Sequence, residues 1–335
     1  MLEMFVRHVR DDHGMEFQIA SDGTRFIEQD IFRVELGVQP EGLRVRLAGP
    51  NESALVFFRE EIVHHVADLD TVAADAMRWD DESGWQEGQL PPNFHLLTVK
   101  HSNLLFEGMQ RVTLSCPTIA NTTQEGIHLR LMMPQDVTRT PIWPHMAANG
   151  APVWPQGDDK LHARFVTVRQ CRPEAGEIDI DIVRHDTGLI SQFAQSAHEG
   201  QVVGGMGPAG MNHLPQHDTY LLTADGTGLP AVARLLETLP DTAKGDVIVA
   251  LPEGVDYLPQ SPLTLHRVAP DRFETEILSM VKERAAQTPI AYGFFAGEFE
   301  NAQEIRKFFK GGLGLDKSTQ ISTAYWRRGN PGFGS

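Results

Sequence analysis

Hydrophobic and polar positions divide the chain into three parts, of which the first is residues 1–90. Short runs with the two-residue alternation of strands come first, and one segment of helical spacing follows them. The strand-like runs are residues 17–20, 25–27, 32–36 and 42–48. The helix is expected to begin at Asn51 or Ser53, whose side chains can cap it. Its apolar face is expected to carry Leu55, Phe58, Ile62 and Val66. This order predicts a small α+β domain, and residues 83–92 resemble a linker.

The second part, residues 93–216, has little helical periodicity. Strand-like runs are expected at residues 97–100, 109–115, 127–132, 162–169 and 177–184. One short helix is expected at 189–197, and residues 133–161 have the Pro and Trp content of a loop. Several strands at moderate spacing indicate a β-barrel or a sandwich, and we predict an antiparallel β-barrel.

The third part, residues 217–335, alternates between the two periodicities. Strands are expected at residues 220–224, 246–251, 263–267, 291–296 and 320–326. Helices are expected at residues 229–239, 273–287 and 301–309. Alternating strands and helices predict a parallel sheet covered by helices, an α/β Rossmann-like nucleotide-binding domain.

Composition excludes several classes of protein. The chain has 335 residues, of which 41% are hydrophobic and 22% charged, as in ordinary globular proteins. Its two cysteines exclude a disulfide scaffold and a four-thiolate iron–sulfur cluster within one chain. No apolar run is long enough to cross a bilayer, and no signal peptide is apparent. We therefore expect a soluble, cytoplasmic protein that does not insert into a membrane.

Charge is unevenly distributed along the chain. The formal net charge is −16, and residues 1–90 hold 8 Lys or Arg against 19 Asp or Glu. The sign reverses in residues 303–328, where six cations stand against two anions. The basic residues of this segment that could attract a ligand are Lys307, Lys310, Arg327 and Arg328. A basic patch on an acidic protein favours a small anionic ligand over nucleic acid, which the rest of the surface would repel.

Two segments of the second part could bind phosphate. The first is Arg164-Phe-Val-Thr-Val-Arg169, because arginine offers the planar pair of donors that phosphate accepts. The second is the strand, turn and helix around Gly188, because amides at a helix start can hold a pyrophosphate. An amphipathic strand with surface arginines and a plain strand–turn–helix connection are the ordinary alternatives.

Two segments of the third part could bind a nucleotide or a ring. Residues 225–230, Asp-Gly-Thr-Gly-Leu-Pro, form a strand-to-helix loop but lack the full Gly-x-Gly-x-x-Gly pattern. Near the end, Ala296-Gly-Glu298 and Tyr325-Trp-Arg-Arg328 could bring an aromatic ring beside cations. A tight loop needing small residues and a buried aromatic residue are the ordinary alternatives. After the second strand, Glu253 and Asp256 mildly favour the ribose hydroxyls of NADH.

Other chemistries have little support. Glu61-x-x-His64 and Glu125-x-x-His128 share a spacing, but a di-iron site needs such pairs on facing helices with further glutamates. We therefore expect no metal site. The Gly-x-Ser-x-Gly pattern of serine hydrolases is absent.

The order of these motifs closely resembles the siderophore-interacting protein family, ferredoxin-reductase-like flavoproteins that reduce ferric siderophores. The resemblance covers about residues 96–329 and rests on the segments 164–169, 185–194, 224–231, 296–298 and 325–329. Residues 1–90 look like a small acidic α+β domain of unknown role that is sometimes fused to such proteins. The expected domains are therefore 1–90, an FAD-binding barrel at 93–216, and an NAD(P)H-binding domain at 217–335 with a basic C-terminal segment.

The resemblance implies a set of cofactor contacts. FAD would contact Arg164, Val166 and Thr167, and the main chain of Val183, His185, Gly188, Ile190 and Ser191. NADH or NADPH would lie near Asp225, Thr227 and Gly228. Hydride would pass to the flavin, which would give single electrons to the ferric chelate, and no side-chain acid or base is required.

The sequence departs from the family pattern at five positions. These are Val166, Asp186, Leu189, Phe193 and Ala224, where the pattern has Tyr, Gly, Pro, Trp and Gly. The loss of an aromatic side chain at 166 removes a stacking platform worth about 1–3 kcal/mol by analogy with nucleic-acid bases. FAD is therefore expected to bind less tightly, or to rest on another residue such as Trp326.

The resemblance implies an NAD(P)H-dependent ferric-siderophore reductase that releases Fe(II) in the cytoplasm. Two alternatives stay open at this point: a siderophore- or haem-binding protein without turnover, and a flavin reductase that supplies another protein. The sequence leaves open the role of residues 1–90, for which a protein partner is one possibility, as well as the siderophore and the oligomeric state.

Overall fold

The computed structural model describes residues 1–13, 15–29, 32–40, 42–80, 85–120, 126–136, 138–186 and 188–330. The chain divides into two compact units, which are described separately below. The first unit comprises Met1–Phe94 and Met133–Leu161, and the second comprises His95–Met132 and His162–Ser335. The second unit therefore contains both the barrel and the α/β sheet, and the 133–161 segment is grouped with the N-terminal residues.

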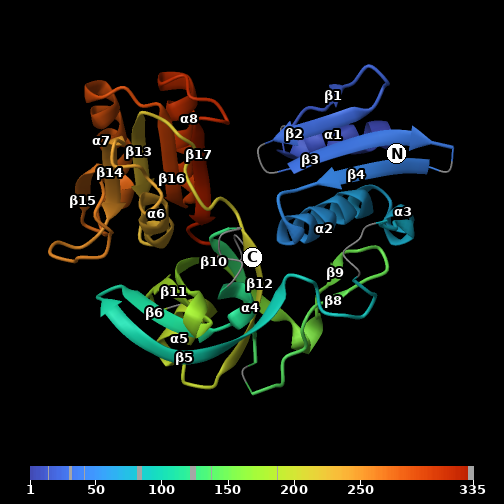
Figure 1. The fold of residues 1–335 in the computed structure, drawn as a ribbon, viewed down its shortest axis with the longest axis horizontal. Coiled ribbons are helices and arrows are strands. Elements are labelled where there is room, and N and C mark those ends of the chain that lie inside the picture. Colours follow the sequence, from blue (N-terminus) through green and yellow to red (C-terminus); the bar gives the residue numbers. More distant parts are fainter. Residues whose placement is uncertain are drawn as a thin grey trace. The chain divides into compact units, whose positions relative to one another are not determined.

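The N-terminal unit is a four-stranded antiparallel sheet with helices packed on one face (Figure 1). Its strands are β1 (Gln18–Ile19), β2 (Arg25–Gln29), β3 (Phe32–Gln39) and β4 (Gly42–Ala48). Its helices are α1 (Leu2–His13), α2 (Glu52–Leu69) and α3 (Thr71–Ala76). Phe5 and Val9 of α1 pack with Leu36 of β3 and with Ile62 and Val66 of α2. The α+β prediction for this region is confirmed.

Two details of this unit differ from the expectation. Helix α1 was not predicted, although Phe5 and Val9 lie one helical turn apart and are both buried. In α2 the Asn51 side chain caps the helix as expected, accepting a bond from the Ala54 amide at 2.9 Å. The buried face of α2, however, is centred on Val56, Arg59, Ile62, Val63 and Val66, so Leu55 and Phe58 are only partly buried.

Hydrogen bonds from two tryptophan side chains, Trp79 outside the segment 133–161 and Trp154 within it, connect this segment to the helical part of the unit. It contains the short strands β8 (His145–Met146) and β9 (Pro152–Val153) and the 3-10 turn η2 (Gly157–Asp159). The Trp79 indole donates to the Asn149 carbonyl at 2.7 Å, and the Trp154 indole donates to Glu60 Oε1 at 2.7 Å. These side-chain bonds fix a loop that has little secondary structure of its own.

The first half of the second unit is a closed six-stranded barrel in the order β10-β11-β6-β5-β12-β7. The strands are β5 (Phe94–Phe106), β6 (Met109–Ser115), β7 (His128–Pro134), β10 (Leu161–Arg172), β11 (Glu177–Val183) and β12 (Val202–Ala209). Short helices at its margins are α4 (Pro117–Ala120), η3 (Pro173–Ala175) and α5 (Leu189–Ser196). The antiparallel barrel is confirmed. Strand β12 was not predicted because glycine is rare in strands, yet an added Cβ at Gly205 would approach Leu97 Cδ1 to 2.9 Å.

The second half is a five-stranded parallel sheet in the order β15-β14-β13-β16-β17 (Figure 1). Its strands are β13 (Thr219–Ala224), β14 (Lys244–Ala250), β15 (Thr264–Val268), β16 (Tyr292–Glu298) and β17 (Gln320–Trp326). Its helices are α6 (Leu229–Leu236), α7 (Phe273–Gln287) and α8 (Phe299–Gly312). Successive strand residues face opposite sides, so Leu222 and Phe294 pack with α6 while Leu221 and Phe295 pack with α7 and α8.

The barrel lies against the carboxyl edge of this sheet. An added Cβ at Gly226, after β13, would come within 3.3 Å of Val183 Cγ2, at the end of β11. Tyr257, in the loop after β14, donates its hydroxyl to Asp181 of β11 at 2.6 Å. In open α/β sheets this edge is where ligands bind. The fold therefore places the barrel and the sheet on the two sides of the candidate site.

We predict that the substitution Gly293→Ala destabilises the second unit, because its Cβ would lie 2.6 Å from Cε2 of the fully buried Phe309. Overpacking of this kind costs about 1–3 kcal/mol. The matched control is Gly311→Ala in α8, where an added Cβ meets nothing within 4 Å. Urea unfolding should show a lower midpoint for the first variant alone, and equal midpoints would contradict the packing described here.

Candidate functional site

A hydrogen-bonded chain of three side chains joins the barrel to the sheet. Thr167, buried on β10, lies 3.4 Å from His128 Nδ1 on β7, measured from its Oγ1. On the other side of the imidazole, the Tyr325 hydroxyl on β17 lies 3.2 Å from His128 Nε2. The two rings meet edge to face, with centroids 5.6 Å apart. The chain therefore fixes the orientation of the Thr167 hydroxyl, which the sequence analysis singled out.

Burial keeps the members of this chain neutral. Desolvation, with a smaller effect of the Arg234 cation, lowers the pKa of His128 to about 4. Burial and the nearby Asp225 carboxylate raise the pKa of Tyr325. A neutral imidazole can donate from one nitrogen only. If the Thr167 hydroxyl donates to a bound ligand, His128 must carry its proton on Nδ1 and Tyr325 must donate to Nε2.

The start of α5 forms a cradle beside the barrel. Gly188 precedes the helix with φ of +96°, and an added Cβ there would lie 2.7 Å from His185 Cε1. The first hydrogen bond within the helix runs from the Gln192 amide to the Gly188 carbonyl. The amides of the first turn, including those of Ile190 and Ser191, therefore have no carbonyl partner within the helix. A side chain at 188 would meet the His185 ring at the start of this helix.

The main chain of His185, a predicted FAD contact, forms hydrogen bonds within the protein. The His185 amide donates to Ser191 Oγ at 2.9 Å, and the Ser191 hydroxyl donates back to the His185 carbonyl at 2.9 Å. The resemblance implied a main-chain contact with FAD from each residue; the His185 amide is engaged here, whereas the Ser191 group in this pair is its side-chain hydroxyl. The neighbouring Arg184 supplies an alternative donor: its Nε is buried and has no hydrogen-bond partner among the described residues.

Arg164 and Val166 lie on β10 beside Thr167. The Arg164 side chain is partly buried, and its Nη1 donates to the Ala163 carbonyl at 2.6 Å. Burial lowers the pKa of this guanidinium, so a bound anion would stabilise its charge. Val166 is 9% exposed and packs in the barrel.

The loop after β13 is organised by Asp225. Asp225 Oδ1 accepts from the Thr227 amide at 2.7 Å, from the Thr227 hydroxyl at 2.6 Å and from the Gly228 amide at 3.3 Å. Its Oδ2 accepts from the Trp326 indole at 2.7 Å. The carboxylate is 7% exposed, and burial raises its pKa. Asp225 thus shapes the loop from within, and Trp326 is held in place by it.

The Ala296-Gly-Glu298 segment also has a local role. An added Cβ at Gly297 would lie 2.7 Å from Asp225 Oδ2, so only glycine leaves room for that carboxylate. Glu298 caps α8 by accepting from the Glu300 amide, and its other oxygen accepts from the Arg328 amide at 3.2 Å. At Gly228 an added Cβ would lie 2.5 Å from the Ala296 carbonyl oxygen. These motifs bring β13, β16 and β17 together at one edge.

The four predicted substrate-binding cations do not lie together. Arg327 and Arg328 follow β17 at the carboxyl edge; the Arg327 guanidinium lies 4.4 Å from the Phe299 ring centroid, and Arg328 pairs with Glu274 at 2.6 Å. Lys307 and Lys310 are exposed on α8. They lie about 12 and 16 Å along this helix from its start at the same edge, at about 1.5 Å per residue.

A cavity of about 520 Å³ opens between the barrel and the loop after β14. Arg111, Arg169, Asp256 and Tyr257 are among the residues that line it. Arg111 makes a bidentate pair with the Asp181 carboxylate, with distances of 2.7 and 2.8 Å. The same carboxylate accepts a hydrogen bond from the Tyr257 hydroxyl. Asp256, which the sequence linked to a ribose, therefore lies on a cavity at the carboxyl edge of the sheet.

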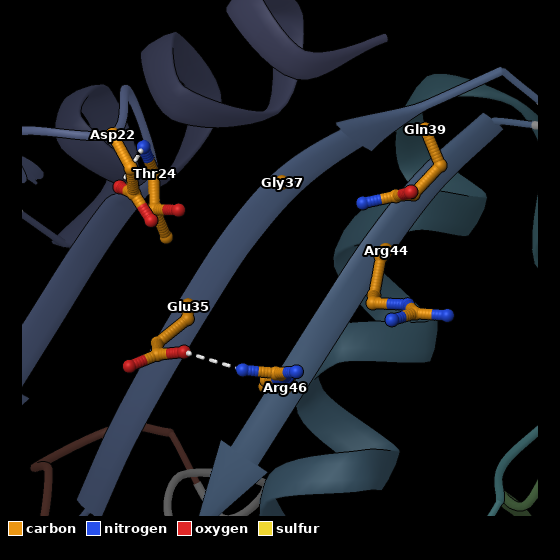
Figure 2. Close-up of a pocket in the computed structure, with 7 residues that line it drawn as sticks. All are labelled: Asp22, Thr24, Glu35, Gly37, Gln39, Arg44 and Arg46. Atoms are coloured by element: carbon orange, nitrogen blue, oxygen red, sulfur yellow. Dashed lines mark hydrogen bonds and ion pairs between the residues drawn. The ribbon is translucent and has the colours of Figure 1, made fainter.

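A second hollow lies on the open face of the N-terminal sheet (Figure 2). Its lining is polar, and Figure 2 shows Glu35 and Arg46 pointing toward one another across β3 and β4, 3.8 Å apart. Its volume is only about 200 Å³. Because its volume is small, it is not a candidate for binding a dinucleotide.

The residues of the second unit fit FAD. The glycine cradle at α5 and the buried Nε of Arg184 suit a pyrophosphate. Arg164 on β10 is a further cation, which burial partly desolvates. The buried hydroxyl of Thr167 is oriented by His128. The donor set matches what a flavin dinucleotide needs.

The sequence did not indicate His128 or Arg184 as parts of the site, and it indicated Tyr325 only as an aromatic residue beside cations. His128 was considered only for its spacing from Glu125, which lies outside the described residues. Its real partners, Thr167 and Tyr325, are 39 and 197 residues away in the chain. No local pattern signals such a pairing.

Comparisons with known proteins agree with this architecture. Residues 98–212 match the family model of the siderophore-interacting FAD-binding domain, and residues 217–329 match that of the siderophore-interacting protein. The ferric vibriobactin reductase ViuB of Vibrio cholerae is 27% identical over 248 residues, which is 70% of this chain and 89% of that protein. An NADPH-dependent ferric-chelate reductase of Escherichia coli is 31% identical over 162 residues, 47% of this chain and 62% of that protein.

Solved structures give the same result. The siderophore-interacting protein SipS from Aeromonas hydrophila superposes with a TM-score of 0.58 and 26% identity, over 71% of this chain and 92% of that one. A siderophore utilization protein from T. fusca has a TM-score of 0.58 and 26% identity, over 73% and 96%. The antiparallel barrel, the parallel sheet and the match to an FAD-binding family model define an FAD-containing oxidoreductase. The chain belongs to the siderophore-interacting protein family.

In the part of the chain that the structure describes, no helix combines the length and the apolar composition needed to span a bilayer.

We predict that His128 stays neutral far below the pH at which an ordinary imidazole titrates, because burial lowers its pKa to about 4. In the folded protein His128 binds a proton only near pH 4, whereas in the unfolded chain it does so near pH 6.5. The contribution of His128 to the free energy of unfolding therefore falls as the pH drops from about 6.5 toward 4. Ring ¹⁵N spectra between pH 5.5 and 8, assigned with His128→Gln, should show no protonation of His128. A titration midpoint near 6.5 would contradict the buried chain.

Proposed function

We propose that this protein reduces ferric siderophores with electrons from NADH or NADPH through bound FAD, and releases iron as Fe(II). The observation that carries the proposal is the meeting of two binding regions at one edge. The chain from Thr167 through His128 to Tyr325, and the close approach of Gly226 to Val183 at the end of β11, bring the barrel to the loop that Asp225 shapes after β13. Each region suits one of the two nucleotide cofactors.

The chain's own side chains would hold and orient FAD. Arg164, Arg184 and the first-turn amides of α5 would bind its phosphates. Thr167 would donate to the ring system, with His128 and Tyr325 fixing the direction of its hydroxyl. Bound FAD supplies the exchange between a two-electron donor and a one-electron acceptor. No side chain is required as an acid or base.

Trp326 would take the place of the missing aromatic side chain at position 166. Its indole N–H is anchored to Asp225 at 2.7 Å, which holds the ring at the carboxyl edge. A stacked aromatic ring of this kind contributes about 1–3 kcal/mol. Asp225 therefore links the nicotinamide loop, formed with Thr227 and Gly228, to the residue proposed to cover the flavin.

The substrate would be an anionic ferric chelate that approaches Arg327 and Arg328. Both lie at the carboxyl edge, which supports them over Lys307 and Lys310, whose positions along α8 are remote from it. Fe(III) is bound tightly by hard oxygen ligands, and reduction to Fe(II) loosens it. Because NADH and NADPH are cytoplasmic metabolites, the proposal places this reaction in the cytoplasm.

We predict that Gly188→Ala lowers the affinity for FAD, because its Cβ would enter the cradle and its positive φ disfavours a side chain. The control is Gly200→Ala, which has a similar φ of +84° but open space around its Cβ. The full chain should bind FAD, turn yellow, and bleach on anaerobic addition of NADH or NADPH. A ferric catecholate added next should restore the colour and yield Fe(II) trapped by a ferrous chelator.

Several outcomes of that experiment would contradict the proposal. Equal FAD affinity in the two glycine variants would remove the cradle from the site. A protein that binds ferric chelate but no flavin would be a binding protein. A yellow protein whose NAD(P)H oxidation is not accelerated by ferric chelates above the oxygen background would be a flavin reductase for another acceptor.

We predict that Arg327→Gln raises the KM for an anionic ferric catecholate several-fold at low salt and leaves kcat nearly unchanged, because it removes a steering charge. The control is Lys317→Gln, an equal charge change at the turn before β17, at the opposite edge of the sheet. Raising the ionic strength should bring the wild type closer to the Arg327 variant. An equal rise in KM for both variants would show a general charge effect instead.

A further inference from the structure

A cluster of imidazole and carboxylate groups lies in the N-terminal unit, where α1 packs against α2. His8 belongs to α1, and His65 and Asp68 belong to α2. Their possible ligand atoms all lie within 4.8 Å of one another. Among the described residues, this is the group of His, Cys, Asp or Glu side chains with the spacing to hold a metal ion.

The distances match the edges of a coordination sphere. His8 Nε2 lies 3.1 Å from His65 Nδ1 and 3.6 Å from Asp68 Oδ2. Ligands about 2.1 Å from one ion are separated from each other by about 3.0–3.4 Å. Two imidazoles and one carboxylate are a ligand set suited to divalent first-row transition metals, with positions left for water. A small inward movement of Asp68 would complete the set.

The ligands lie on two helices that share one hydrophobic core, and the site opens to solvent. His65 and Asp68 are three residues apart on α2 and therefore share one face of the helix. His8 lies between Phe5 and Val9, which are buried in the core. The side chains of His8 and His65 are 17% and 13% exposed, whereas that of Asp68 is 47% exposed. The imidazoles are thus fixed, and an ion can enter past the carboxylate.

A further carboxylate stands behind one ligand. His65 Nε2, the ring nitrogen on the far side from the cluster, lies 3.9 Å from Glu61 Oε2. Histidine ligands of metals commonly present their other nitrogen to such a carboxylate, which fixes the tautomer and the ring orientation. His64 Nε2 lies 3.8 Å from Asp68 Oδ2 and adds another imidazole on the exposed side. The surrounding charge of residues 1–90, with 19 acidic against 8 basic residues, attracts cations.

We propose that His8, His65 and Asp68 form a binding site for a divalent first-row transition-metal ion, with the Glu61 carboxylate near the outer nitrogen of His65. The site belongs to the first unit, whereas the residues assigned to FAD and NAD(P)H belong to the second, so the proposal does not rest on the reductase activity. It gives the N-terminal domain a chemistry that the sequence did not indicate, since His8 and His65 are 57 residues apart.

The test is a titration of the full chain, free of any histidine tag, with Zn(II) by calorimetry and with Co(II) by visible absorption. We expect one ion per chain for the wild type and at least tenfold weaker binding for His8→Gln and for Asp68→Asn. The matched control is Asp75→Asn on α3, an exposed residue outside the cluster, which should bind as the wild type does. Far-UV circular dichroism checks that each variant is folded.

Two results would overturn the proposal. One is a wild type that binds neither Zn(II) nor Co(II) stoichiometrically. The other is binding of equal affinity in the wild type, His8→Gln and Asp68→Asn, which would place the ion elsewhere. Because Asp68 is half exposed, its amide variant is expected to fold even if His8→Gln does not.

Discussion

The buried hydrogen-bond chain from Tyr325 through His128 to Thr167 is the interaction on which the site depends. It crosses from the last strand of the parallel sheet to the barrel, and it has no charged member because burial keeps both rings neutral. In a neutral imidazole one ring nitrogen accepts a hydrogen bond and the other donates one. If Nε2 of His128 accepts from the Tyr325 hydroxyl, Nδ1 must donate to the Thr167 hydroxyl. The orientation of one hydroxyl is thus determined by residues of both halves of the unit.

Asp225 provides the second link across the same edge. Its carboxylate binds the loop after β13 with one oxygen and the Trp326 indole with the other. Glycine at 297 is required because that carboxylate occupies the space a side chain would need. Motifs that look like separate ligand-binding signals in the sequence are therefore parts of one packed edge. Their first role is structural, and the binding surface results from it.

Local patterns in the sequence were sufficient for the regular elements. The helix 273–287 and the five parallel strands could be predicted because each has its own pattern of apolar side chains along one segment. Strand β12 was missed because its glycines serve close packing with Leu97. The family resemblance supplied Thr167 and Gly188. Neither approach found His128 or the His8–His65 pair, since those contacts join residues far apart in the chain and depend on the finished fold.

The measurement that tests the central claim most directly is the rate at which NAD(P)H bleaches the flavin of Thr167→Val and Thr167→Ser under anaerobic stopped flow. We expect bleaching to be about tenfold slower in the valine variant, because it loses the stabilisation of about one hydrogen bond, and to be near the wild-type rate in the serine variant. Equal rates in all three proteins, each saturated with FAD, would show that the Thr167 hydroxyl does not contact the ring and would contradict the site described here.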